Sequence, residues 1–356
     1  RLMTRLAIEH DAVNLSQGFT DEAPVFDMVW GAFAASLGGT PEGESALSTM
    51  TVAEALARAG SPGDDLTLGE LLRALQNPRD QFNQYSFPFG MPELRHAIAE
   101  YTQRYAGFRP DENDEITVVL GASEGMAATF RALCEPGDRV IIIQPFHEIY
   151  PAQLEIFGLE PVFVSLREDI GSGRWLLDLD ALRALAQDPR TKMVVFNAPH
   201  NPTGKVFDEV ELSEIADICM EGDLIVLTDE IYEHMVFDGR RHLSLRQMPG
   251  MPERTALVNS ISKTGRATGW RVGWVIAPPD WTRKIRAVHD NLAVQAPSPL
   301  QKGTVHLLCQ SPEFFEGIAA HYQQKRNQLM AGLANVGFRC ATPEGAYYPV
   351  SYTHLT

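Results

Sequence analysis

A lysine at the end of an apolar run is the first residue whose position suggests chemistry. Lys263 lies in residues 260–264 (SISKT), directly after the apolar run 256–258. Burial at the end of such a strand disfavours the ammonium ion and lowers the pKa of the amine. A neutral amine can attack a carbonyl carbon and form a Schiff base. Arg271 follows eight residues later beside two glycines, and its guanidinium can bind a phosphate through two hydrogen bonds.

Two further clusters follow apolar runs. Asp229 lies in residues 228–232 (TDEIY), after the run 224–227. A carboxylate there projects from a buried strand and needs a cationic partner, which is equally a structural ion pair or a ligand contact. Asn201 lies in residues 197–204 (NAPHNPTG), after the run 193–196. The turn-forming residues of that segment, taken alone, indicate only a connection from strand to helix.

A glycine-rich turn forms the fourth cluster. Residues 121–125 (GASEG) follow the β-branched run 115–120 and begin a predicted helix. The free N–H groups and the dipole at the start of a helix favour a bound phosphate. Each of the four clusters is weak evidence alone, because glycine turns and lysines at strand ends are common.

The elements that would position these clusters alternate between strand and helix. Their spacing predicts strands at 115–120, 139–143, 161–166, 193–196, 224–228 and 256–260, helices at 92–105, 123–134, 179–187 and 209–221, and mainly helix over 281–335. Strands separated by helices indicate an α/β fold with a mostly parallel central sheet and helices on both faces. Such sheets bind ligands at the carboxyl ends of their strands, where all four clusters are expected.

Taken together, the clusters resemble the class I/II aminotransferases, which are fold-type-I enzymes that use pyridoxal 5′-phosphate. The order and spacing are most similar to the branch with kynurenine, glutamine and methionine aminotransferases. The resemblance runs from residues 13–19 (VNLSQGF) to 343–348 (PEGAYY), and its most specific parts are NAPHNPTGKVF, TDEIYE and SISKTGRATGWRVGW. It implies a transferase that moves an amino group between an amino acid and a 2-oxo acid through a pyridoxamine form.

The resemblance also implies a role for individual residues. Lys263 matches the lysine that forms the internal aldimine and later moves the substrate's α-proton. Asp229 matches the carboxylate that keeps the pyridine nitrogen protonated, so that the ring accepts electrons. Tyr232 and Asn201 match the donors to the phenolic oxygen, and Asn201 also faces the substrate. The phosphate cradle is matched by Arg271, Ser260 and the turn formed by Ala122, Ser123 and Glu124.

Three more positions carry implications from the resemblance. Tyr85 matches a tyrosine that reaches the cofactor phosphate of the neighbouring subunit, which implies a homodimer with shared active sites. Gly18 matches a glycine that lines the site of the substrate carboxylate. His147 occupies the position of the aromatic ring that stacks on the cofactor, and imidazole can also stack. The alternatives are that Phe146 stacks instead, or that His147 is an ordinary loop histidine.

Composition narrows the partners and the location. The chain has 356 residues, with 30 Lys and Arg against 46 Asp and Glu, and a net charge of −16. An acidic chain argues against nucleic acid or an anionic membrane surface as a partner, and no apolar run is long enough to span a bilayer. The four cysteines are far apart, which is typical of a reduced, cytoplasmic protein. The histidines form no metal-binding pattern, so we expect no metal site.

The predicted organisation has four parts. Residues 1–37 form the N-terminal segment of a small domain, 38–80 an insertion, 81–294 the large cofactor-binding domain, and 295–356 the rest of the small domain. Two Thr-x-x-Glu capping boxes, at Thr51 and Thr67, predict two short helices within the insertion. The insertion is interpreted either as a surface addition or as a lid over the site.

The C-terminal end departs from the family pattern. Sequences of the family continue beyond the GAYY segment and include an arginine that binds the substrate carboxylate, whereas residues 349–356 (PVSYTHLT) resemble a foreign tail. We therefore expect a C-terminally truncated chain with an incomplete small domain. Two alternatives to an aminotransferase remain open on the same residues: a carbon–sulfur β-lyase that uses the same cofactor, and an inactive fragment.

Overall fold

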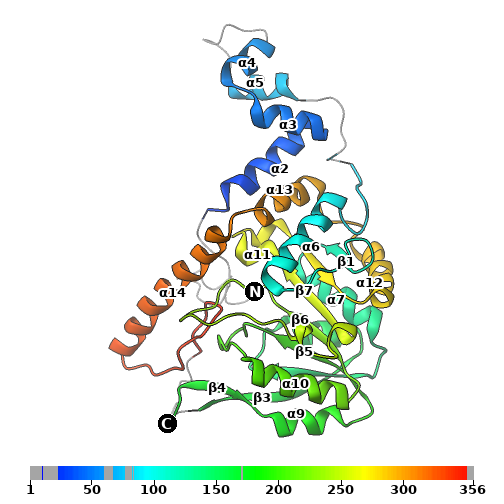
Figure 1. The fold of residues 1–356 in the computed structure, drawn as a ribbon, viewed down its shortest axis with the longest axis vertical. Coiled ribbons are helices and arrows are strands. Elements are labelled where there is room, and N and C mark those ends of the chain that lie inside the picture. Colours follow the sequence, from blue (N-terminus) through cyan, green and yellow to red (C-terminus); the bar gives the residue numbers. More distant parts are fainter. Residues whose placement is uncertain are drawn as a thin grey trace.

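A mixed sheet forms the centre of the protein. The computed structural model describes residues 10, 23–59, 67–76, 82, 84–169 and 171–350. In this part of the chain, eight strands form one sheet in the order β1-β8-β7-β6-β5-β2-β3-β4 (Figure 1). The strands are β1 (Ile116–Val119), β2 (Arg139–Gln144), β3 (Glu160–Asp169), β4 (Arg174–Leu177), β5 (Thr191–Asn197), β6 (Ile225–Asp229), β7 (Thr255–Ser260) and β8 (Gly273–Ile276).

The middle of this sheet is parallel. β2 pairs in parallel with β3 and β5, and β6 pairs in parallel with β5 and β7. β8 runs antiparallel between β1 and β7, and β4 runs antiparallel beside β3. The prediction of a mostly parallel sheet is therefore confirmed, and the six predicted strands are present. The sequence analysis did not predict β4 and β8.

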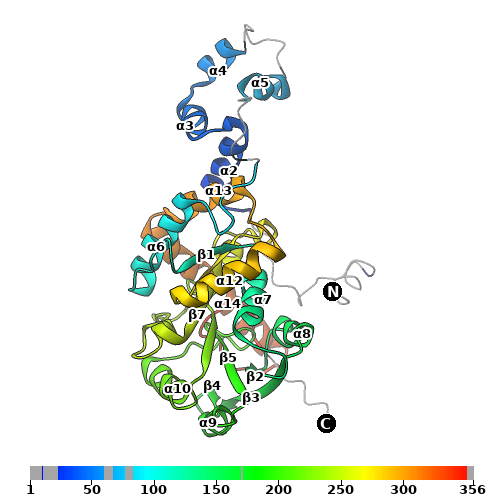
Figure 2. The same ribbon diagram turned by 90° about the vertical axis from the view of Figure 1, so that its right-hand side faces the viewer.

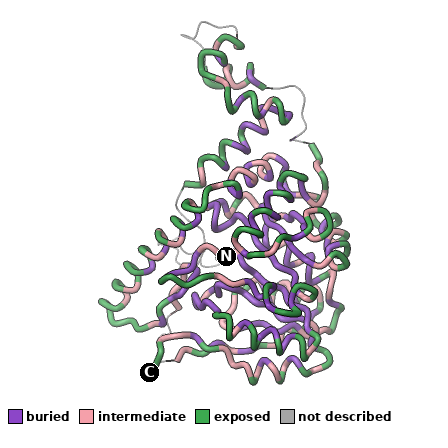
Figure 3. Tube along the Cα trace, viewed as in Figure 1, coloured by how far each residue is buried: buried purple, intermediate pink, exposed green. Residues whose placement is uncertain are grey.

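Side chains that alternate along the strands supply two apolar layers. On β5, Met193 and Val195 join one buried cluster, while Val194 and Phe196 join another on the opposite face. A strand buried on both faces reads as a continuous apolar run, which explains why the sequence pattern identified β2, β5 and β6. Figure 3 shows buried residues gathered in the middle of the body, and β1, β6, β7 and β8 are buried at every position.

Helices cover both faces. One face is covered by α7, α8 and α12, and the other by α9 and α10 near β3 and β5 and by α6, α13 and α14 near β1 and β8. The helices of the large body are α6 (Pro92–Ala106), α7 (Ala122–Leu133), α8 (Ile149–Ile156), α9 (Leu179–Ala186), α10 (Glu209–Glu221), α11 (Ile261–Thr264), α12 (Pro279–Leu292), α13 (Ser298–Leu308) and α14 (Pro312–Asn335).

The N-terminal helices extend away from the body as an arm (Figure 2). They are α2 (Phe26–Gly38), α3 (Pro41–Thr49), α4 (Val52–Arg58) and α5 (Leu68–Leu75). Thr51 and Thr67 form the two predicted capping boxes at the starts of α4 and α5, and α3 is an additional helix that the sequence analysis did not predict. Glu44 fastens the arm to α13 through Lys302 at 3.2 Å and His306 at 3.4 Å.

Candidate active site

A buried amine lies at the carboxyl edge of the sheet. Lys263 is in the short helix α11, which begins directly after β7, and it is only 9% exposed. Its Nζ donates a hydrogen bond to the Tyr347 hydroxyl at 2.7 Å. Burial lowers the pKa of Lys263 to about 8, the charge of Asp229 opposes this, and the charge of Arg271 adds to it. The amine is therefore much closer to its neutral, nucleophilic form than an exposed lysine at neutral pH.

A buried carboxylate lies on the neighbouring strand. Asp229 is the last residue of β6 and is 3% exposed. Tyr150, at the start of α8, donates a hydrogen bond from its hydroxyl to Asp229 Oδ2 at 2.8 Å. Burial raises the pKa of Asp229 to about 6, and the hydrogen bond from Tyr150 limits the rise. The carboxylate is therefore held ionised at neutral pH in a site where water alone would not stabilise it.

Tyr150 is a residue that sequence reasoning missed. It lies 79 positions from Asp229 along the chain, and no motif connects the two residues. The only signal in the sequence was its place just after the segment that contains His147. The hydrogen bond thus ties the His147 loop to the carboxylate.

Tyr232 and Asn201 lie in the same region. The Lys263 Nζ is 5.5 Å from the centre of the Tyr232 ring, and Tyr232 is fully buried, which raises the pKa of its hydroxyl well above the usual value. Asn201 is positioned by a residue that the sequence analysis did not single out. Asn197 accepts a hydrogen bond from the Asn201 backbone at 2.6 Å and donates one to the Asp229 carbonyl at 2.8 Å. The ends of β5 and β6 are thereby locked together.

The glycine turn and the arginine are in direct contact. Gly121 caps the start of α7 with φ +76°, a conformation that favours glycine. A Cβ atom at Gly121 would lie 2.3 Å from Nη2 of Arg271, so only a glycine lets the guanidinium approach this backbone. Ala122 and Ser123 follow in the first helical turn. A guanidinium beside the start of a helix is suited to a doubly charged phosphate.

Ser260 and Glu124 are placed at the same edge, but their side chains have partners in the protein. The Ser260 hydroxyl accepts a hydrogen bond from the Ser262 backbone and so begins α11. The Glu124 carboxylate accepts one from the Leu120 backbone at 2.9 Å and contacts His289 at 3.0 Å. The Glu124 side chain therefore stabilises the turn, and its charge faces His289.

The remaining predicted residues are spread more widely. His147 is exposed in the loop before α8, where its Nδ1 accepts a hydrogen bond from the Ile149 backbone at 3.1 Å. Phe146 stacks on Phe163 with ring centres 5.2 Å apart, so its ring is engaged elsewhere and His147 remains the candidate for stacking. Tyr85 is 83% exposed. Gly18 lies outside the described residues.

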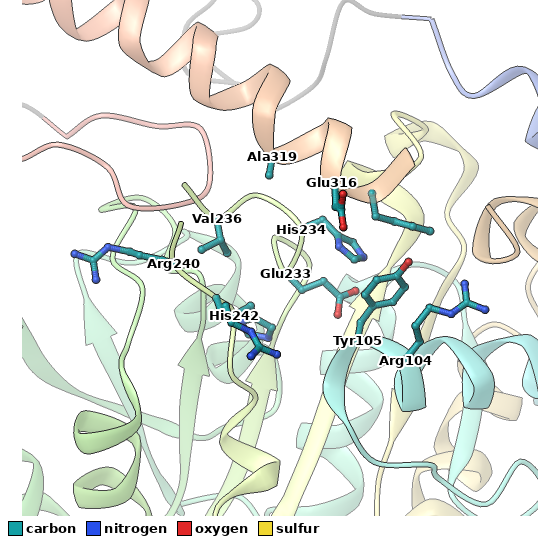
Figure 4. Close-up of a pocket in the computed structure, with 11 residues that line it drawn as sticks. Arg104, Tyr105, Glu233, His234, Val236, Arg240, His242, Glu316 and Ala319 are labelled. Atoms are coloured by element: carbon teal, nitrogen blue, oxygen red, sulfur yellow. The ribbon is translucent and has the colours of Figure 1, made fainter. Parts of the chain in front are cut away.

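A separate cavity of about 370 Å³ lies between α6, the loop after Tyr232 and the start of α14 (Figure 4). Glu233 lines it and accepts hydrogen bonds from the Tyr101 hydroxyl at 2.6 Å and the Asn259 amide at 2.5 Å. Burial raises the pKa of Glu233 to about 7. Because Glu233 follows Tyr232 and Asn259 precedes Ser260, this acid links the loop after β6 to the end of β7 from outside the site.

The chain matches known proteins along most of its length. The sequence profile described as aminotransferase class I and II matches residues 55–354. The chain belongs to the class I and II aminotransferase family. It is 33% identical to human kynurenine–oxoglutarate transaminase 1 over 98% of this chain and 76% of that protein. It is 37% identical to a probable N-succinyldiaminopimelate aminotransferase of Mycobacterium tuberculosis over 85% of this chain and 76% of that protein.

Solved structures of aminotransferases have the same fold. The structure of N-succinyldiaminopimelate aminotransferase from Mycobacterium tuberculosis superposes with a TM-score of 0.80 at 33% identity, covering 98% of this chain and 78% of that chain. YbdL from Escherichia coli, for which a methionine aminotransferase function is described, gives a TM-score of 0.81 at 28% identity, covering 100% of this chain and 81% of that one. The predicted fold-type-I architecture, the aminotransferase activity and the dependence on pyridoxal 5′-phosphate are confirmed.

The residues of this aminotransferase fit its cofactor. The group carries an aldehyde, a pyridine nitrogen and a phosphate, which call for an amine, an acid and a cationic cradle. Lys263 is a buried amine, Asp229 a buried acid and Arg271 a cation beside the start of α7, and electrostatic interactions couple the lysine to both of the others. The contact between Gly121 and Arg271 leaves no room for a side chain at position 121.

Proposed function

We propose that Lys263, Asp229, Tyr232, Asn201 and Arg271 form the catalytic site of this aminotransferase. The observation that carries the proposal is the buried Lys263 amine, with its lowered pKa, under the influence of both Asp229 and Arg271. Lys263 would hold the cofactor through its amine and Asp229 through the pyridine nitrogen. The phosphate would be held by Arg271, Ser260 and the start of α7.

The chemistry then divides between the cofactor and the protein. When bound, pyridoxal 5′-phosphate supplies the electron sink that stabilises negative charge at the substrate's α-carbon. Asp229, kept ionised by the hydroxyl of Tyr150, would hold a proton on the ring nitrogen. Lys263 Nζ takes the α-proton and returns it, which requires a pKa near the working pH. The value of about 8 for Lys263 meets this requirement.

Tyr347 is a candidate partner of the lysine in these proton transfers. Its hydroxyl accepts the hydrogen bond from Lys263 Nζ, and its position is fixed by the preceding Glu344. That carboxylate pairs with Arg174 at 2.9 Å and Arg240 at 2.8 Å. We propose that Tyr347 keeps the amine aimed into the site when it is not bonded to the cofactor.

We also propose a substrate with an uncharged or aromatic side chain. The Tyr347 ring lies 5.3 Å from the Tyr232 ring and 4.7 Å from the Tyr348 ring, so aromatic groups gather beside Lys263. Such a wall favours apolar side chains over carboxylates. The similarity to kynurenine–oxoglutarate transaminase 1 is in keeping with this class.

We propose further that the protein is a cytoplasmic homodimer with shared active sites. Tyr85, the residue expected to reach the partner's cofactor, is 83% exposed, and Phe87 beside it is 52% exposed. On α2, Phe26, Trp30 and Phe33 leave an apolar stripe exposed, which is the kind of surface that dimers bury.

The four cysteines are free thiols, as in a reducing compartment. No helix in the described part of the chain is long and apolar enough to cross a membrane.

One spectroscopic experiment tests the site. Purified protein loaded with pyridoxal 5′-phosphate should show a visible absorbance band that resists dialysis, and the Lys263→Ala variant should lack it. Lys302→Ala is the matched control, because Lys302 pairs with Glu44 of the arm and not with the site. An unchanged band in Lys263→Ala would exclude Lys263 as the attachment point.

A product assay compares the aminotransferase reaction with the two alternatives named in the sequence analysis. The aminotransferase should consume an amino acid and a 2-oxo acid in equal amounts. Release of pyruvate and ammonia from a β-thiol amino acid, without need of an oxo acid, would instead identify a carbon–sulfur β-lyase. A chain that binds the cofactor and turns over neither kind of substrate would match the inactive fragment.

A further inference from the structure

A fully buried histidine lies against the turn formed by residues 121–124, which we call the phosphate turn. His289, near the C-terminal end of α12, is 0% exposed. Its Nδ1 lies 3.0 Å from both carboxylate oxygens of Glu124, and its Nε2 lies 3.0 Å from the carbonyl oxygen of Pro88. Both ring nitrogens therefore face groups that only accept hydrogen bonds. A neutral imidazole carries one N–H and would leave one of these contacts unsatisfied, whereas an imidazolium satisfies both.

The electrostatics agree with this geometry. Burial, the largest single cause, would lower the pKa of His289, but the hydrogen bond and charge of Glu124, the Pro88 carbonyl and Asp290 together outweigh it. The pKa of His289 is consequently raised. Buried charges persist where they are paired and hydrogen-bonded, and Glu124 also accepts the Leu120 backbone N–H at 2.9 Å.

The two contacts of His289 join two separate parts of the chain. Glu124 is in the turn 121–124 that begins α7, and Pro88 is in residues 84–91, which we call the Tyr85 loop. The loop is also held by Gln295, whose side chain accepts the Ser86 backbone N–H at 2.5 Å. His289 is thus the charged link between the phosphate turn of one site and the loop whose Tyr85 is expected to serve the partner's site.

We propose that His289 is a positioning residue that, as an imidazolium, holds the phosphate turn 121–124 against the Tyr85 loop and so strengthens binding of the cofactor phosphate. It touches neither the cofactor nor the substrate, and acts through Glu124 and Pro88. The inference rests on the proposed function, which places the phosphate at this turn.

The test compares two ligands that differ only in the phosphate. Binding of pyridoxal 5′-phosphate and of pyridoxal to the full chain is measured by absorbance titration after the cofactor has been removed. In His289→Gln, we expect the dissociation constant of pyridoxal 5′-phosphate to rise about tenfold, the smaller end of the range for loss of a charge-assisted hydrogen bond. The dissociation constant of pyridoxal should stay unchanged, because pyridoxal has no phosphate to hold.

Two further variants keep the test decisive. Glu124→Gln keeps an acceptor for the Leu120 backbone but removes the charge, so it should reproduce the selective loss if His289→Gln fails to fold. His306→Gln is the matched control, because His306 pairs with a different glutamate, Glu44 of the N-terminal arm, at 3.4 Å. It should leave both dissociation constants unchanged.

The outcomes separate this inference from the proposed function. Equal weakening of both ligands, or no weakening of either, in His289→Gln and Glu124→Gln would overturn the role of His289. If the wild-type protein prefers the phosphorylated ligand, the proposed placement of the phosphate survives that result. If the wild-type protein binds both ligands equally well, the placement of the phosphate is wrong and the inference falls with it.

Discussion

Removal of one hydroxyl group should change the charge of the buried carboxylate. The Tyr150→Phe substitution deletes the hydroxyl that donates to Asp229 Oδ2 at 2.8 Å. The ring itself is packed in the apolar cluster with α7 and the central strands, and phenylalanine preserves that packing. The substitution thus isolates the hydrogen bond from the rest of the Tyr150 side chain.

The size of the effect follows from the hydrogen bond that is lost. A hydrogen bond to a charged group contributes about 1.5–3 kcal/mol, and one pKa unit corresponds to about 1.4 kcal/mol. Loss of the donor should therefore raise the pKa of Asp229 by about 1–2 units. Since burial already raises this pKa to about 6, half or more of the Asp229 side chains in the variant should be protonated near neutral pH.

The free energy of unfolding should also change with pH, in the direction that the raised pKa of Asp229 sets. The pKa of Asp229 is higher in the folded protein than its ordinary value of 3.8, so the cofactor-free protein loses stability as the pH rises from 3.8 through the folded pKa. In Tyr150→Phe this loss continues to higher pH. The variant should thus be closest to wild type in acid and fall furthest behind it, by about 1.5–3 kcal/mol, at alkaline pH.

Infrared titration of the protonated carboxyl group measures the pKa directly, and urea unfolding at acid and alkaline pH measures the stability. Asp229→Asn identifies the Asp229 band by its absence. Tyr105→Phe is the control for loss of a tyrosine hydroxyl outside the site, because Tyr105 is in α6 and lines the separate cavity. With cofactor bound, turnover of Tyr150→Phe should fall near neutral pH and recover at alkaline pH. An unmoved titration midpoint, or a stability loss that is the same at both pH values, would refute the reasoning.

Three other substitutions test neighbouring features. Gly121→Ala should abolish tight cofactor binding in a dialysis assay, because its Cβ would lie 2.3 Å from Arg271 Nη2; normal binding would contradict the cradle. Glu233→Gln should stabilise the protein at pH 8 by up to about 3 kcal/mol and not at pH 4, since the pKa of Glu233 is raised to about 7; urea unfolding at both pH values decides this. Glu344→Gln should cost about 1 kcal/mol in the same assay, because Arg174 and Arg240 lose their shared carboxylate but stay about a third exposed to water; an unchanged free energy of unfolding would show that this cluster does not anchor Tyr347.

The sequence by itself determined the framework. Apolar runs that are buried on both faces identified β2, β5, β6 and β7, and the capping boxes at Thr51 and Thr67 identified α4 and α5. These signals are local, because hydrophobic periodicity and helix caps act within a few residues. The motifs that contain Lys263, Asp229 and Arg271 were expected at the carboxyl edge of the sheet, because each motif follows a predicted strand.

The short strands β4 and β8 lacked such a signal. β8 is four residues long and lies within a segment rich in glycine and tryptophan, and β4 is formed by its antiparallel pairing with β3. In strands this short, partner strands decide the structure more than local propensity does. The helix α3 begins at a Thr-Pro pair but has no Thr-x-x-Glu box, so the pattern that revealed α4 and α5 did not reveal it.

Only the tertiary structure decided which side chains support the site. Tyr150 and Asp229 are 79 positions apart, and His289 and Glu124 are 165 apart. Whether such residues meet depends on strand order, on register and on the way α8 and α12 pack against the sheet. The residue types needed for the chemistry can be read along the chain, but the charge state of each group depends on burial and on distant donors, and these exist only after the chain has folded.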